Sequence, residues 1–236
     1  MSLPKLQYPI FEIEVPSLKL KYKFRPFLVK EEKILLTAQQ SGDIKEMVLA
    51  LKQVINNCCQ DTSFDPEALT LFDVEYMFLK LRARSVNNVV EITVVDREDE
   101  KEYKLSCNLD DVVMSNDPEH NPVINLNDDL SITLRYPKIE MLDKIQMMQF
   151  NVSLFFEVIK YCIEEIKYKD EIFDLQNYNE KEIEEFIQQI DVSGFNKITK
   201  FFDTMPKMKH VLTYKNSNDK EQKIVLETLA DFFILG

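Results

Sequence analysis

Apolar and polar residues alternate along the first part of the chain, which is the pattern of strands with one buried face. Phe11, Ile13 and Val15 fall on one face, and after the break at Pro16 the alternation resumes and continues to Phe24. Two such runs joined by a proline-containing bend predict an antiparallel hairpin. Glutamates line the outer face of the first run and lysines that of the second, so we expect charge pairing across the strands to fix the register.

A helical period follows this hairpin. Good helix formers extend over Lys30–Gln40, and Gly42 supplies a C-terminal stop. Asp43 is placed to cap a second helix, and Asp65 precedes a proline that suits the first turn of a short helix. A further helix is predicted to begin at Asp73.

Period two returns between Asn87 and Tyr136. Two alternating runs flank the charged turn Asp96–Glu100 and predict a second hairpin. Ile132 and Leu134 predict one more short strand. These elements make the region 1–137 a mixture of antiparallel hairpins and helices.

The pattern changes after Pro137, where Lys138–Lys169 is predicted to form one long helix or two abutting helices. Apolar residues recur there at alternating steps of four and three over about four heptads. This stripe consists of Met141, Ile145, Met148, Val152, Phe155, Ile159, Cys162 and Ile166. Additional apolar residues widen the surface, so a helix buried in its own chain fits better than a coiled-coil seam, although both interpretations stay open.

The remaining sequence predicts two shorter helices and a last hairpin. Asn179 caps one helix, and another is expected over 194–204. Val211–Tyr214 and Lys223–Leu226 flank a polar turn and predict the hairpin. The fold class is therefore α+β, with a mixed region 1–137 and a mostly helical region 138–236 that ends in a hairpin.

Composition and charge exclude several classes of function. The chain has 41 acidic and 29 basic residues, a formal charge of −12, which disfavours nucleic-acid binding. Its 3 glycines leave no glycine-rich loop for phosphates. A membrane span needs about 20 largely apolar residues in a row, and no such run or signal peptide is evident. The 4 irregularly spaced cysteines indicate reduced thiols in a cytoplasm.

No motif predicts catalysis, a metal site or a cofactor. His120 and His210 each stand alone, without the spacing of a zinc site, and a packing or hydrogen-bonding role is favoured for both. The paired carboxylates Asp110–Asp111 and Asp128–Asp129 are better explained as solvated turn residues than as acid–base or calcium groups. No nucleophile elbow or cysteine–histidine pattern is present. The sequence predicts a protein that is not an enzyme.

Four segments resemble a known family. They are Arg25–Leu36, Phe72–Val86, Phe201–His210 and Leu226–Phe233. Together they resemble the baseplate hub assembly proteins of T-even-like contractile-tailed bacteriophages. The resemblance implies an assembly factor, a late protein of the host cytoplasm, that binds the tape-measure protein or another hub protein. The alternative it leaves is a permanent structural subunit of the virion tail baseplate.

Two sets of residues are the candidates for contact with a partner. The first is the polar patch of Arg25, Phe27, Lys30, Glu31 and Lys33. A solvated first helical turn explains this patch equally well, because Glu31 lies near the positive end of the helix dipole. The second set is Val152 and Phe155 from the apolar stripe. Self-association of the chain also stays open.

Overall fold

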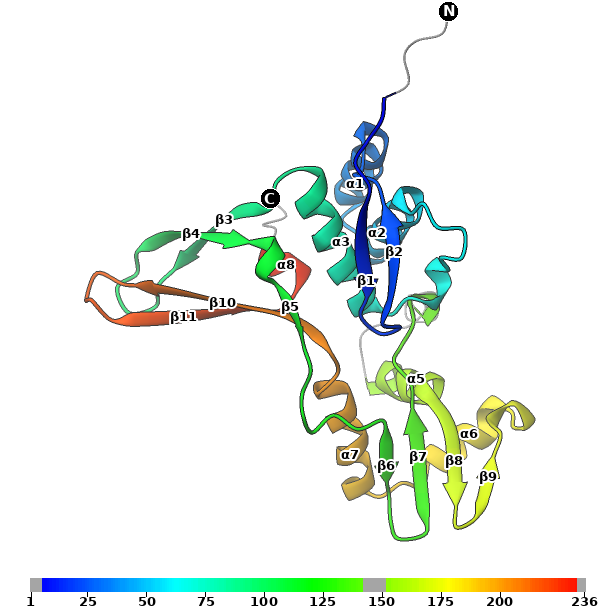
Figure 1. Ribbon diagram of the computed structural model, residues 1–236. Coiled ribbons are helices and arrows are strands. Elements are labelled where there is room, and N and C mark those ends of the chain that lie inside the picture. Colours follow the sequence, from blue (N-terminus) through cyan, green and yellow to red (C-terminus); the bar gives the residue numbers. More distant parts are fainter. Residues whose placement is uncertain (1–5, 142–151, 233–236) are drawn as a thin grey trace, which may run out of the picture. The chain divides into compact units, whose positions relative to one another are not determined.

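The computed structural model describes residues 6–141 and 152–232. The chain divides into two compact units, one formed by 1–115 together with 207–236 and the other by 116–206 (Figure 1). The second unit is thus inserted into the first. Composition predicts a domain boundary after Pro137, a position that falls within the second unit. That division at 137/138 stays a prediction.

Within the described residues, the first unit combines four helices with paired strands. Its elements in chain order are β1 (Phe11–Val15), β2 (Leu20–Phe24), α1 (Val29–Ser41), α2 (Ile44–Cys58), a 3-10 turn (Pro66–Ala68), α3 (Leu71–Ser85), β3 (Val89–Val95), β4 (Glu102–Asn108), a 3-10 turn (Leu109–Asp111), β5 (Val113–Ser115), β10 (Lys207–Lys215), β11 (Glu221–Leu226) and α8 (Leu229–Phe232).

The first hairpin is confirmed, including its register. β1 and β2 pair antiparallel, with Glu12 opposite Lys23 and Glu14 opposite Lys21. Opposite charges therefore face each other across the strands, as the alternation predicts. Lys19 closes the turn with a φ of 56°, a left-handed conformation.

Local side-chain hydrogen bonds determine where the helices begin. The Asp43 side chain accepts a hydrogen bond from the Lys45 N–H at the start of α2, as expected. Helix α3 begins two residues before the predicted Asp73, because Thr70 is its N-cap and Asp73 completes a capping box. The buried Asp73 carboxylate also accepts two hydrogen bonds from Ser17, which joins the first hairpin to α3.

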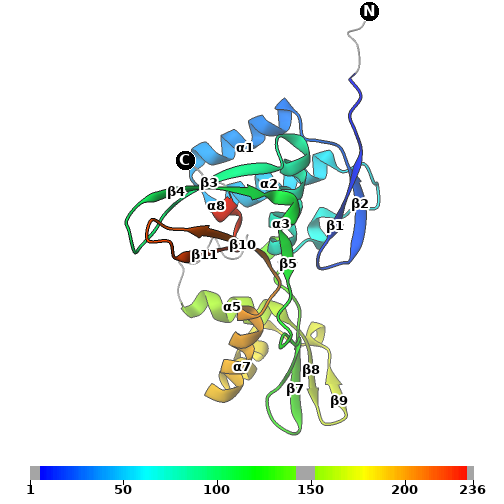
Figure 2. The ribbon, with the colours of Figure 1, turned by 60° about the vertical axis from the view of Figure 1, so that its left-hand side comes forward.

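Two longer hairpins, β3–β4 and β10–β11, run alongside each other away from the helices (Figures 1 and 2). Both hairpins are confirmed predictions. Their inner faces share one core cluster with α3 and α8, and β5 pairs with the beginning of β10. The buried members of the cluster are Leu79, Ala83, Ile92, Cys107, Leu109, Val112, Met208, Leu212, Leu226 and Phe232.

Within the residues that the structure describes, the second unit contains a four-stranded antiparallel sheet in the order β6-β7-β8-β9 and three helices packed with it. Its elements are β6 (Val123–Asn125), β7 (Leu130–Leu134), a 3-10 turn (Ile139–Met141), α5 (Val152–Cys162), β8 (Ile163–Tyr168), β9 (Glu171–Phe173), a 3-10 turn (Leu175–Asn177), α6 (Glu180–Gln188) and α7 (Val192–Asp203). The Asn179 and Asp191 side chains cap α6 and α7.

The long helix predicted over Lys138–Lys169 is wrong in its last part. Helix α5 ends at Cys162, and the next residues form β8, which pairs with both β7 and β9. Ile166 lies opposite Ile132 in β7, so burial between strands overrides the helical spacing. Ile145 and Met148 lie outside the described residues. The α+β class is confirmed, but the C-terminal region is not mostly helical.

Candidate partner-binding site

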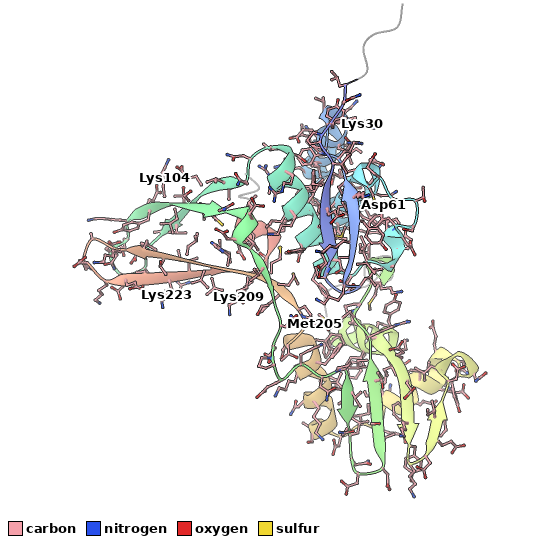
Figure 3. The ribbon with its side chains drawn as sticks, in the orientation of Figure 1. Lys30, Asp61, Lys104, Met205, Lys209 and Lys223 are labelled. Carbon is pink, nitrogen blue, oxygen red and sulfur yellow. The ribbon has the colours of Figure 1, made fainter. Side chains whose placement is uncertain are left out.

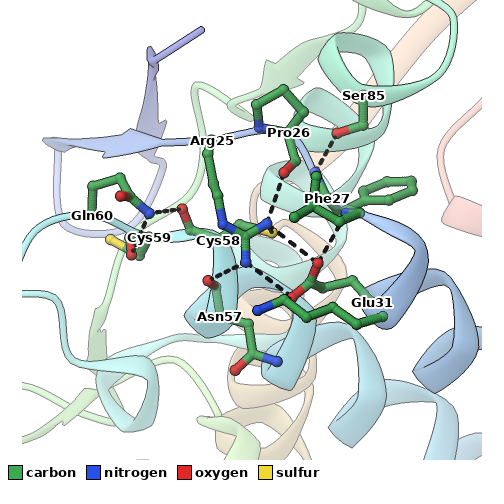
Figure 4. A network of polar contacts seen from close by, with 11 residues as sticks. Arg25, Pro26, Phe27, Glu31, Asn57, Cys58, Cys59, Gln60 and Ser85 are labelled. Carbon is green, nitrogen blue, oxygen red and sulfur yellow. Dashed lines mark hydrogen bonds and ion pairs between the residues drawn. The ribbon is translucent and has the colours of Figure 1, made fainter. Parts of the chain in front are cut away.

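Arg25 is the centre of a polar network rather than a free surface charge. Its guanidinium contacts both oxygens of Glu31, at 3.0 and 3.2 Å, and donates to the carbonyls of Pro26 and Asn57. Figure 4 shows it between the first turn of α1 and the C-terminal end of α2. A planar group with donors on both nitrogens suits this arrangement, because it satisfies a carboxylate and backbone carbonyls together. The Arg25 network therefore joins β2, α1 and α2.

Glu31 is fully buried, with a relative exposure of 0%. Burial alone would raise the pKa of its carboxyl group. The hydrogen bonds from Arg25 and from the Leu28 N–H, with the charges of Arg25 and Lys30, outweigh burial and lower the pKa below its ordinary value. Glu31 is consequently an ionised structural group that also holds the start of α1.

Cys58 lies beside this network, 3.6 Å from an Arg25 nitrogen. Burial raises the pKa of the Cys58 thiol to about 12, although the charge of Arg25 opposes the rise. The thiol is therefore protonated and unreactive near neutral pH. All four cysteines of the chain are free thiols.

Phe27 connects two of the segments on which the family resemblance rests. Its backbone N–H donates to the Ser85 hydroxyl at 3.0 Å, and its ring stacks on Phe78 with centroids 6.4 Å apart. Ser85 and Phe78 both belong to α3. The segments 25–36 and 72–86 therefore meet through Phe27, which is itself buried.

Lys30 and Lys33 are the members of the predicted patch that remain on the surface. The Lys30 side chain is 68% exposed on α1 (Figure 3), although its ammonium lies 3.5 Å from Glu31 Oε1. Lys33 is also exposed. An apolar groove of about 260 Å³ lies beside the same helix, and Leu36 and Met47 are among its lining residues. In the predicted patch, Lys30 and Lys33 are therefore exposed, whereas the other three residues form a largely buried anchor. The anchor consists of Arg25, Phe27 and Glu31.

The second predicted contact pair belongs to the other unit. The Phe155 ring makes edge contacts with Phe195 and Phe202 of α7, at 5.8 and 5.5 Å between centroids. It is half-buried and packs against the core of this unit. Val152 begins α5, and its side chain lies outside what the structure describes. A contact of either residue with a partner stays a prediction.

His120 is packed and hydrogen-bonded, as predicted. Its Nδ1 lies 2.9 Å from the Thr204 hydroxyl, and its Nε2 lies 3.0 Å from the Tyr136 hydroxyl. Because the Thr204 hydroxyl already donates to the Lys200 carbonyl, Nδ1 is the donor and Nε2 accepts from Tyr136. This is the neutral imidazole, and burial correspondingly lowers the pKa of His120.

The described residues offer little else for chemistry. Within the described ranges, no three histidine, cysteine or acidic side chains gather as a metal site. Over the same ranges, no helix has the length and apolar character that crossing a membrane requires.

An open apolar cavity lies in the second unit where β8, β9 and α6 meet, and the sequence patterns did not predict it. The reason is that the apolar spacing predicted a helix over Ile163–Lys169, where the structure has β8. The signal that was available is the alternation of Ile166 and Tyr168 ahead of Lys169, which adopts a left-handed turn conformation (φ 56°).

Comparison with protein families decides the identity of the chain. A family model described as "T4 bacteriophage base plate protein" matches residues 8–234, which include both units. The chain belongs to this family. It is therefore a bacteriophage baseplate protein, as the resemblance implied. Comparisons with curated proteins and with solved structures find no match.

Proposed function

We propose that this baseplate family member is a non-enzymatic assembly factor for the hub of a contractile tail, and that it binds the tape-measure protein or another hub protein. The family match over residues 8–234 is the observation that carries the proposal. The proposed role places the chain in the host cytoplasm during assembly. A permanent structural subunit of the baseplate is the second candidate, because the family description fits a resident subunit equally well.

The exposed and the buried members of the predicted contact set are proposed to have different roles. Lys30 and Lys33 are proposed to contact the partner directly, because both are exposed on α1. The proposed role of Arg25, Phe27 and Glu31 is to hold α1 in position, through the Arg25 network and the Phe27–Phe78 stack. Phe155 would act through the packing of α5 on α7.

Co-expression with single phage hub proteins and the tape-measure protein tests the proposal. A complex that copurifies with the chain is expected, and Lys30→Glu/Lys33→Glu should weaken it. The matched control Lys209→Glu/Lys223→Glu makes the same charge change on exposed residues of the β10–β11 hairpin (Figure 3) and should leave the complex intact.

Mass spectrometry of purified virions separates the two candidates. An assembly factor is depleted or absent from finished particles, whereas a structural subunit is present in stoichiometric amounts. If the chain binds no hub component and is stoichiometric in virions, the assembly-factor proposal is wrong and the structural subunit replaces it.

A further inference from the structure

The second unit carries most of the net negative charge of the chain. Residues 116–206 include 18 acidic and 9 basic residues, a formal charge of −9 within the total of −12. The excess is concentrated between Glu164 and Glu185, where nine acidic residues accompany three lysines. A field of one sign over one region attracts partners of the opposite sign from a distance.

An apolar cavity of about 370 Å³ opens within this acidic region. Four of the lining side chains come from one face of the sheet. In the strand register, Leu130 lies opposite Tyr168 and Ile166 lies opposite Phe173, so all four point to the same side. Helix α6 and the turn before it contribute the other lining residues, which are Leu175, Tyr178, Glu182, Ile183 and Phe186.

Part of this lining remains open to solvent. Tyr168 is 44% exposed and Tyr178 is 41% exposed, although both are large aromatic side chains. Tyrosine at such a position offers a large apolar area that can be buried by a partner, together with a hydroxyl that tolerates water.

Carboxylates stand at the mouth of the cavity. Glu171 lies opposite Tyr168 in the register and so occupies the cavity face of β9, and Glu182 is itself a lining residue. Both are exposed, and neither forms an ion pair within the part of the chain that the structure describes. The nearby Lys169 is held by Asp129 at 4.0 Å, with its ammonium 5.3 Å from the centroid of the Tyr168 ring. The mouth therefore keeps a negative excess.

We propose that this acidic cavity binds a basic amphipathic segment of a partner protein. A bulky apolar side chain of the segment enters the cavity, and its lysine or arginine side chains reach Glu171 and Glu182. The inference rests on the proposed function in taking a phage hub or tape-measure protein as the source of the segment. A second copy of this chain fits poorly, because two units of charge −9 repel each other.

A synthetic helix-forming peptide of leucine and lysine, with leucines at helical spacing and a fluorescent label, is the probe. It is titrated into the full chain and followed by fluorescence anisotropy. Glu171→Gln/Glu182→Gln should weaken its binding about fivefold to tenfold and reduce its salt dependence. Glutamine at 182 can still accept the hydrogen bond from the Asn179 N–H, so α6 keeps its cap.

Matched controls show whether peptide binding depends on the cavity or only on the net charge of the protein. Glu91→Gln/Glu102→Gln removes the same charge from exposed positions of β3–β4 in the other unit and should leave binding unchanged. Tyr178→Ala should weaken binding, whereas Tyr8→Ala, at a position of similar exposure (37%), should not. Thermal melting checks that each variant is folded.

Several outcomes overturn the inference. Equal weakening by both glutamine pairs would mean that the peptide follows net charge alone. A peptide with glutamate in place of lysine should not bind, and equal binding of the two peptides would contradict the role of the carboxylates. A dimer of the chain that Tyr178→Ala dissociates, seen by sedimentation, would assign the cavity to a second copy.

Copurification separates this inference from the proposed function. If a hub protein copurifies equally well with wild type, Glu171→Gln/Glu182→Gln and Tyr178→Ala, the proposed function stands and the acidic cavity is not its site. If no hub protein copurifies, but the peptide binds with the expected dependence on the cavity, the function fails and the site stands.

Discussion

The hydroxyl of Tyr214 donates a hydrogen bond to the buried carboxylate of Asp96, at 2.8 Å and across 118 residues of sequence. Asp96 begins the turn of the β3–β4 hairpin and is only 3% exposed. Tyr214 lies near the end of β10. The bond therefore joins the tips of two hairpins that the inserted unit separates in the chain.

Tyr214→Phe should lower the melting temperature in a manner that depends on pH. Burial alone would raise the pKa of Asp96, but hydrogen bonds from the Glu98 N–H, from Tyr214 and from the Asp99 N–H lower it. Its contribution to stability is thus present above the unfolded pKa of about 3.9 and is lost as pH falls through the folded pKa.

The difference in melting temperature between wild type and Tyr214→Phe should accordingly shrink in acid. Scanning calorimetry from pH 7 to pH 2 measures it, with the exposed Tyr8→Phe as the control. A difference that stays constant over this range would assign the effect to ring packing.

Arg25→Ala should destabilise the first unit by about 3–5 kcal/mol, because it leaves the carboxylate of Glu31 buried without its partner. Arg25→Met/Glu31→Gln should recover part of the loss, since it removes both charges while the glutamine still accepts from the Leu28 N–H. Urea denaturation of the single and double variants measures the coupling. Lys33→Ala, at an exposed position of the same helix, is the control and should change stability by less than about 0.5 kcal/mol.

His120 should make the stability of the second unit fall in mild acid. Burial lowers the pKa of His120 in the folded protein, with Asp117 opposing the shift. The unfolded chain then binds more protons, so stability decreases as pH falls below the unfolded pKa of about 6.5. His120→Gln should flatten the change in melting temperature between pH 7.5 and 5.5, whereas His210→Gln should preserve it.

Gly194→Ala should destabilise α7 although alanine is the better helix former. A Cβ atom at this position would lie 2.7 Å from Ile190 Cγ2 and 2.9 Å from Leu126 Cδ2. Overpacking of this kind costs about 1–3 kcal/mol, against a gain in helix propensity of about 1 kcal/mol. Urea denaturation is the measurement, and Ser193→Ala is the neighbouring control. A more stable Gly194→Ala variant would show that these side chains move aside freely.

Local patterns predict the hairpins and most helices because the information for them lies within a few residues. The charge pairs of β1–β2 and the cap of α2 are examples. The strand β8 was not predictable in this way, since Ile163 and Ile166 suit a helix as well as a strand. Pairing of Ile163 with Leu134, and of Ile166 with Ile132 and Phe173, decides between the two.

The candidate site also depends on contacts between residues that are distant in sequence, which local patterns do not predict. Spacing alone indicates that Arg25 and Glu31 are near each other, but the carbonyl of Asn57 and the thiol of Cys58 come from a distant helix end. Those contacts convert an apparent surface patch into a buried anchor. The acidic cavity was equally hidden, because its lining comes from three strands, a turn and a helix.

The insertion of the second unit has a consequence for synthesis on the ribosome. Residues 116–206 are contiguous and can fold as soon as they emerge, whereas the first unit needs β10 and β11 to complete its core. Until then, the inner face of β3–β4, with Ile92 and Cys107, has no covering hairpin. Ser115 and Lys207 pair directly in the finished sheet, so the core of the first unit is completed only after the chain has been made as far as β11.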